Sequence, residues 1–229
     1  MGTSGQYWVA VAFGGTIGLI ACIVARRYPG RPATRVGRAL AVLLAADAIT
    51  FILRPVVTGD WSARDSLPLA LCDAALVLAA IVCWLPRWQL GVELTYFWGL
   101  TGTLQAVLTP DLSTPFPHLA FIQFVVGHLG IVVAALYLVL GLGLEPRRGS
   151  VPRVFAITAA YTACVGVVDA LTGGNYMYLA DRPAHASLLS MLGPWPWYLA
   201  SAAAVAFTML LVLDAPFHHR AGLSGPGRR

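Results

Sequence analysis

Charge is the scarcest property of this sequence. Only 11% of its 229 residues are charged, whereas 58% are hydrophobic and the mean hydropathy is +0.74. Ordinary soluble domains carry about a quarter charged residues. A chain with so few charges cannot cover itself with polar surface. This excludes a soluble globular protein and indicates a protein that uses lipid as its solvent.

Lysine is absent, and so are the motifs that hold metals or build a disulfide framework. All 15 basic residues are arginine. None of the cysteines belongs to a C-x-x-C motif or to a Cys/His cluster at zinc spacing; they stand in separate apolar runs as Cys22, Cys72, Cys83 and Cys164. We therefore expect no metal and no cofactor. The sequence also has no internal repeat.

Long apolar runs are abundant instead. A membrane-spanning helix needs about 20 mostly apolar residues. Seven runs meet this length, at 6–25, 38–57, 67–85, 89–108, 118–143, 153–172 and 194–213. No basic residue precedes the first run, so we expect a retained helix and not a cleaved signal peptide. The sequence predicts one all-α domain of seven transmembrane helices over 1–215, followed by a disordered basic tail at 216–229.

The arginines predict the orientation in the membrane. With the N-terminus outside, twelve of them fall in cytoplasmic loops or in the tail, and three fall outside, namely Arg54, Arg64 and Arg182. This is the split that the positive-inside rule requires. We expect a multi-pass protein of the cell inner membrane with a cytoplasmic C-terminus. The net charge of +5 then reflects topology and contact with the bilayer, not nucleic acid binding.

Polar residues of the predicted helices and their outer loops gather in one half of the membrane. An ionisable side chain inside a membrane is costly and by default indicates function. Eight such positions lie in the outer half or at its rim: Arg54, Cys72, Asp73, Gln105, His128, Asp169, Asn175 and Tyr176. The inner half has little comparable except Glu93, which we expect to extend to the cytoplasmic surface. Because these positions come from five helices and from the outer loop that follows one of them, they predict one cavity open to the outside.

Structural roles are an alternative for some of these residues. Asp47 or Asp73 would pair with Arg54 to hold two helices together, and a buried cysteine such as Cys72 usually behaves as a small apolar residue. His128 is the best candidate for chemistry. It lies about 15 Å deep, and an imidazole exchanges protons near neutral pH.

Five segments of the chain resemble a known family. They read LPLALCD, WGLTGTLQAVLTPDL, FPHLAFIQFVVGH, GGNYMYL and LGPWPWYL. In this order they are similar to the YwaF-like integral membrane proteins of bacteria, which have seven helices. That family is distantly similar to a eukaryotic multi-pass family of cysteine-type lipid acyltransferases. The resemblance implies that Cys72 accepts an acyl group and that His128 is its base. Relatives commonly read LPLHLC, where this chain has Ala70 in place of the histidine.

The leading hypothesis is phospholipid acyl transfer in an outward-facing cavity. Cys72 would be the nucleophile and His128 its base, with Asp73 or Asp169 orienting the imidazole. The residues expected to bind the phospholipid, or another lipid substrate, are Arg54, Gln105, Asn175 and Tyr176. 

Two other functions fit the same residues. A proton-coupled transporter or permease would use Asp47, Asp73 and Asp169 as a proton relay. The absence of an internal repeat and of a polar path through the inner half speaks against it. A non-catalytic lipid-binding membrane factor would make Cys72 dispensable.

Overall fold

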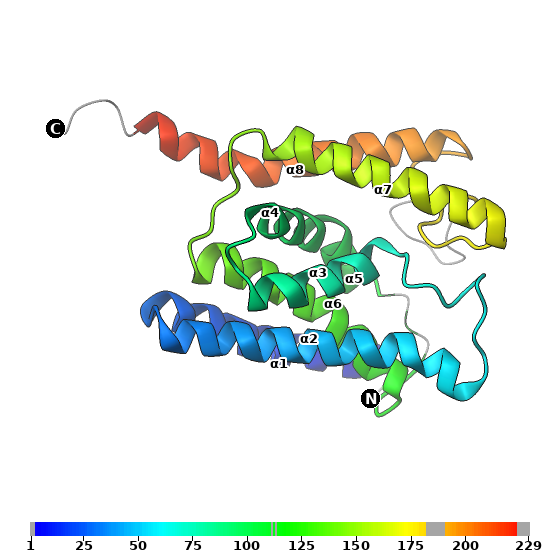
Figure 1. Cartoon of the computed structure of the whole chain (residues 1–229), viewed down its shortest axis with the longest axis horizontal. Coiled ribbons are helices and arrows are strands. Elements are labelled where there is room, and N and C mark those ends of the chain that lie inside the picture. Colours follow the sequence, from blue (N-terminus) through cyan, green and yellow to red (C-terminus); the bar gives the residue numbers. More distant parts are fainter. Residues whose placement is uncertain (1–2, 111, 113, 182–190, 224–229) are drawn as a thin grey trace.

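The chain folds into helices. The computed structural model describes residues 3–110, 112, 114–181 and 191–223, and over these residues it has no strand (Figure 1). The elements are α1 (Thr3–Arg27), α2 (Arg31–Thr58), α3 (Leu71–Trp84), α4 (Gln89–Trp98), η1 (Gly99–Thr103), α5 (Leu104–Leu108), α6 (Leu119–Leu136), η2 (Tyr137–Gly141), α7 (Ser150–Thr172) and α8 (Trp197–Leu223). Helix α4 continues through the π-helical segment η1 into α5, and α6 continues into η2, because the junction residues keep right-handed helical dihedral angles.

Five helices are long and apolar enough to cross a membrane. They are Ser4–Arg27, Arg31–Thr58, Leu119–Gly141, Ser150–Thr172 and Trp197–Phe217. The prediction of an all-α membrane protein with several spans is thus confirmed, whereas the count of seven spans stays a prediction. Helix α3 shows why. It has 14 residues, about 21 Å at 1.5 Å per residue, which is less than the roughly 30 Å of a hydrocarbon core.

Several helix boundaries differ from those predicted, and α2 begins at Arg31 and not at residue 38. Helix α3 begins at Leu71 and not at residue 67, because Pro68 disfavours helical geometry in the residue before it and Asp73 caps the helix at Ala70. Helix α8 continues through Pro216 to Leu223. Residues 216–223 of the predicted disordered tail are therefore helical, and residues 224–229 lie outside the described part of the chain.

The helices lie in three layers (Figure 1). Helices α1 and α2 form one layer, α3 to α6 form the middle layer, and α7 and α8 pair on the far side. In the spanning window of α6 and η2, 61% of the residues are buried, against 17% in those of α7 and α8. Helix α6 is therefore the centre of the bundle, and the α7–α8 pair is its periphery.

Glycines allow α6 to approach both neighbours in the first layer. A Cβ atom on Gly18 of α1 would lie 2.4 Å from Val133 Cγ2, and one on Gly130 of α6 would lie 2.5 Å from Leu44 Cδ2 of α2. Small residues at helix contacts permit such close packing in membranes. These contacts fix how α1, α2 and α6 are aligned along their axes.

Helix α2 is packed over only part of its length. Its buried residues lie between Ala33 and Ala48, and no residue from Ile49 to Thr58 is buried. The last third of α2 thus leaves the bundle, with one side chain, Arg54, reaching back to Gln123 of α6.

The two ends of the bundle differ in charge. We call one the arginine-rich end: it contains the α1–α2 turn, residues 84–93 and residues 141–153, and it carries Arg26, Arg27, Arg31, Arg35, Arg38, Arg87, Arg147, Arg148 and Arg153. We call the other the Cys72 end: it contains residues 4–10, 54–73, 103–110 and 169–181, with Arg54 and Arg64. Arg182 lies outside the described residues. This segregation agrees with the arginine split that predicts the orientation, which itself stays a prediction.

Candidate functional site

Cys72 lies in the first turn of α3 and is half-buried. Its Sγ atom accepts a hydrogen bond from Thr103 Oγ1 at 3.7 Å. Thr103 is the last residue of η1 and is 1% exposed, so the thiol meets a hydroxyl that is itself fixed in the middle layer. Sequence reasoning missed Thr103, and its signal is weak: a π-helical turn, which is often found at functional sites, cannot be read from the residues GLTGT.

Asp73 lies in the first turn of α3 and caps the start of the helix. Its Oδ2 atom accepts a hydrogen bond from the backbone N–H of Ala70 at 3.0 Å, which satisfies one of the donors left free before a first helical turn. This explains why an aspartate follows Cys72 in an apolar run. Among the described residues, no hydrogen bond joins Asp73 to His128, so its predicted role in orienting the imidazole stays a prediction.

His128 stands on α6 with one ring nitrogen engaged. Its Nδ1 atom is 2.9 Å from the carbonyl oxygen of Phe124, and the imidazole stacks on the Phe124 ring with centroids 4.3 Å apart. A carbonyl only accepts, so Nδ1 carries the proton and Nε2 is the atom that can take one. The histidine is thus oriented by its own helix and not by a carboxylate.

The alignment of the middle layer relates His128 to the thiol. A Cβ on Gly99 would lie 3.1 Å from Ala135 Cβ and 3.3 Å from the Ile131 carbonyl oxygen. Gly99 thus faces residues 131–135 of α6. The α4–η1–α5 stretch and α6 are antiparallel, so Thr103, four residues after Gly99, faces residues 127–131 of α6. His128 therefore lies at the level of Thr103, while no hydrogen bond or ion pair joins it to Cys72, Asp73 or Asp169 within the described chain.

Asp169, Asn175 and Tyr176 join loops at the Cys72 end. Asp169 Oδ1 accepts a hydrogen bond from the Tyr176 backbone N–H at 3.1 Å. The Tyr176 hydroxyl donates to the Ala63 carbonyl oxygen at 2.7 Å and accepts from the Leu67 N–H at 3.0 Å. Asn175 bonds within its own loop, to the backbone of residues 180 and 181. Tyr176, which Asp169 holds through its backbone, thus fixes the segment that leads into α3, and Asn175 fixes the loop that carries Tyr176.

Arg54 does not form the predicted pair with Asp47 or Asp73. Its Nη1 atom donates to Gln123 Oε1 at 3.3 Å, and the ion pairs found over the described residues involve neither aspartate. Asp47 is buried with Oδ2 against Gly127, where a Cβ would lie 2.8 Å away. The predicted substrate residue Gln105 is half-buried. Gln123, another amide that sequence reasoning missed, is the side chain that Arg54 contacts.

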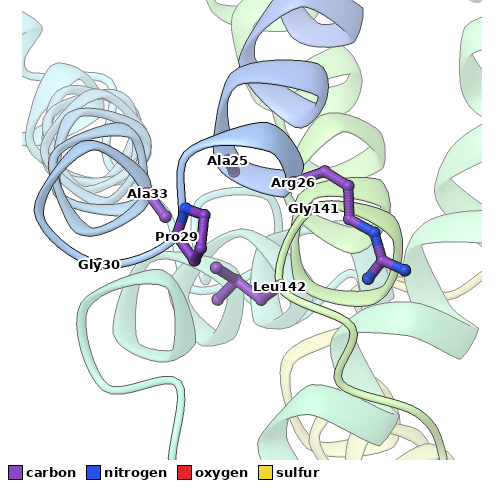
Figure 2. Close-up of a pocket in the computed structure, with 7 residues that line it drawn as sticks. All are labelled: Ala25, Arg26, Pro29, Gly30, Ala33, Gly141 and Leu142. Atoms are coloured by element: carbon purple, nitrogen blue, oxygen red, sulfur yellow. The ribbon is translucent and has the colours of Figure 1, made fainter.

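Surface pockets lie away from these residues. One, of about 290 Å³, is at the arginine-rich end and is lined by Ala25, Arg26, Pro29, Gly30, Ala33, Gly141 and Leu142 (Figure 2). In that view the Arg26 side chain extends away from Pro29 and Ala33. The wall of this pocket is mostly apolar. A second, also about 290 Å³, is lined by Gln6, Val9, Ala10, Phe13, Phe116 and Phe121. The single outward cavity therefore stays a prediction.

A second polar cluster lies at the arginine-rich end. Glu93 is fully buried, contrary to the expectation that it extends to the surface, and both of its oxygens accept hydrogen bonds from two arginines. Arg147 Nε lies 2.8 Å from Oε1, and Arg153 Nε lies 3.0 Å from Oε2. Hydrogen bonding to Glu93 raises the pKa of the Arg147 guanidinium. Nearby, Ser150 Oγ donates to Asp214 Oδ1 at 2.9 Å.

The comparisons with known proteins come to one match. The profile of the TMEM164 family matches residues 2–214. No curated protein and no solved structure matches the chain. Within the described residues, His, Cys, Asp and Glu form no group of three that would hold a metal ion.

Proposed function

The chain belongs to the TMEM164 family. We propose that it is a membrane enzyme that transfers acyl chains between phospholipids through Cys72. The observation that carries the proposal is the hydrogen bond from Thr103 to Cys72 Sγ at 3.7 Å. It fixes a half-exposed thiol at the start of a helix, at the level where His128 offers a free Nε2 atom. The resemblance to cysteine-type lipid acyltransferases supports the same role.

The reaction would proceed through a thioester. His128 Nε2 takes the proton of Cys72, and the sulfur attacks the ester carbonyl carbon of a phospholipid. A C–S bond forms, the C–O bond of the ester breaks, and the imidazolium returns the proton to the departing lysophospholipid oxygen. In the second half, the hydroxyl of another lysophospholipid gives its proton to Nε2 and attacks the thioester. The C–S bond then breaks and the thiol is restored.

The other predicted residues take supporting roles in this proposal. Asp73 starts the helix that presents the thiol. Asp169 and Tyr176 hold the loop that leads into that helix. Arg54 is exposed and carries N–H groups that suit a lipid phosphate. Placement in the cell inner membrane with the Cys72 end outside completes the proposal.

Trapping of the acyl intermediate tests the proposal. The purified protein is incubated in detergent with a phospholipid, quenched in acid and weighed intact. We expect an added mass of one acyl chain, its absence in Cys72→Ser and His128→Ala, and several-fold slower formation in Thr103→Val. Cys164→Ser is the control, because Cys164 is exposed and distant in sequence from the site. An acyl adduct that persists in Cys72→Ser, or none in the unaltered protein, contradicts the proposal.

A proton-coupled transporter is the second candidate. One observation favours it: Asp47 is buried in the α2–α6 contact and has no hydrogen bond or ion pair with any residue that the structure describes. A carboxyl without a partner inside a membrane is a candidate proton carrier. Proton uptake into proteoliposomes that is abolished by Asp47→Asn and unchanged by Cys72→Ser would favour transport over acyl transfer.

A further inference from the structure

The last third of α2, which is not buried, makes one polar contact with α6. None of the residues 49–58 is buried, and the side chain that crosses to α6 is Arg54, which donates to Gln123 Oε1 at 3.3 Å. Arg54 itself is exposed. The guanidinium has five N–H groups, so most of them remain available beside this bridge.

Gln123 carries a buried donor that has no partner. The side chain is 7% exposed, and its Nε2 atom makes no hydrogen bond with the described residues. The contact with Arg54 fixes the orientation of the amide, because the arginine only donates and must face the oxygen. The amide nitrogen therefore points elsewhere with its hydrogens unsatisfied. An orphaned buried donor costs about 1–3 kcal/mol, so the amide nitrogen is available to an acceptor that arrives with a ligand.

Helix alignment brings Gln123 near the level of the thiol, about five residues closer to the Cys72 end than His128. A Cβ on Gly127 would lie 3.9 Å from Leu76 Cδ2, which sets the contact between α6 and α3. Gln123 is four residues before Gly127 and Cys72 is four residues before Leu76. Since α3 and α6 both run from the Cys72 end toward the arginine-rich end, the two residues stand one helical turn from the same contact.

We propose that Arg54 and Gln123 form a recognition site for the polar region of an ester-linked phospholipid, with the Arg54 guanidinium on the phosphate and Gln123 Nε2 on the ester carbonyl oxygen. The inference rests on the proposed function, because it supplies the carbonyl that Cys72 would attack. Gln123 lies about 6 Å below the start of α6, which matches an ester group just beneath a headgroup. Arg54 lies on the exposed last third of α2, where a lipid can reach it from the side.

A pair of lipids that differ only in the carbonyl tests the site. Diacyl and dialkyl ether phosphatidylglycerol share one headgroup, and their binding is measured by native mass spectrometry on Cys72→Ser protein, so that thiol chemistry plays no part. We expect about tenfold tighter binding of the diacyl lipid. Gln123→Leu and Gln123→Glu should remove this preference. The glutamate still accepts from Arg54, so its loss of preference reports the missing donor and not a lost fold.

Two further variants complete the test. Arg54→Gln should weaken both lipids alike, since the phosphate is common to them. Gln89→Leu is the control, because Gln89 is an amide at the arginine-rich end that bonds to the Glu145 carbonyl oxygen. Equal binding of the two lipids by Cys72→Ser, or a preference that survives in Gln123→Glu, overturns the inference. Failure of Cys72 to acylate while the ester preference persists would instead overturn acyl transfer and leave this site standing.

Discussion

At the scale of single residues, the polar side chains of the Cys72 end mostly bond to backbone atoms and not to one another. Asp73 accepts from Ala70, His128 donates to Phe124, and Tyr176 bonds to Ala63 and Leu67. Sequence reasoning correctly assigned polar residues to predicted helices, but it could not predict these partners. A backbone N–H or C=O is present at every position, so residue spacing carries no sign of which one a side chain will reach.

Asp73 allows a structural role to be separated from a catalytic one. Asp73→Ala removes the acceptor at the start of α3 and should cost about 1 kcal/mol, seen as a lower unfolding temperature in detergent. Asp73→Asn keeps an oxygen that accepts the same hydrogen bond, so it should retain most of that stability and most of the acylation of Cys72. Full stability with abolished acylation in Asp73→Asn would instead identify Asp73 as the residue that orients His128.

At the scale of elements, the apolar runs predicted the helices well and their contacts poorly. The run 118–143 became α6 with η2, and 153–172 became α7, each within three residues of the predicted bounds. The two π-helical segments were not predictable, because a segment of five residues is too short to show a change in hydrophobic periodicity. The central position of α6 was also not predictable from the sequence. Every run is apolar, and only the packing distinguishes a helix buried on many sides from one that faces lipid.

Two glycines three residues apart in α1 provide a matched test of that packing. Gly18→Ala puts a Cβ 2.4 Å from Val133 Cγ2, and overpacking of this kind costs about 1–3 kcal/mol. Gly15→Ala meets nothing within 4 Å, so it should be neutral or stabilise the helix by up to about 1 kcal/mol. Thermal unfolding in detergent measures both. Equal unfolding temperatures for the two variants would contradict the α1–α6 contact.

The Glu93 cluster pins α7 to α4 and was underestimated from the sequence. Glu93→Gln keeps the shape but removes the charge that two arginines share. Breaking a buried ion pair costs about 3–5 kcal/mol, and we expect about 2 kcal/mol because Arg147 and Arg153 side chains are 52% and 34% exposed. Asp60→Asn, in an exposed loop, is the control and should leave the unfolding temperature unchanged. High salt should weaken the effect only slightly, since Glu93 is out of reach of solvent.

At the scale of the whole molecule, the charge asymmetry predicted from the sequence coincides with a physical separation of the two ends. The arginine-rich end contains Glu93 and its arginines, and the Cys72 end contains the thiol with its polar neighbours. Helices that cross the bundle in alternating directions bring loops distant in sequence to one end, as Gln89 and Glu145 show. The sequence could not show how deep each helix reaches into the membrane. The apolar run at 67–85 predicted a full span, whereas α3 is too short to cross the membrane alone.

Orientation is the remaining property of the whole molecule, and single-cysteine labelling measures it. In a cysteine-free background, Ser4→Cys at the Cys72 end should react with an impermeant maleimide added to intact cells. Arg148→Cys at the arginine-rich end should react only after the membrane is opened, because arginine-rich loops stay in the cytoplasm. Ser62→Cys, in the loop between α2 and α3, should behave like Ser4→Cys, since Tyr176 ties the neighbouring residues Ala63 and Leu67 to the Cys72 end. Labelling of Arg148→Cys from outside would show that the orientation is the opposite of the predicted one. The proposed lipid site would then face the cytoplasmic leaflet.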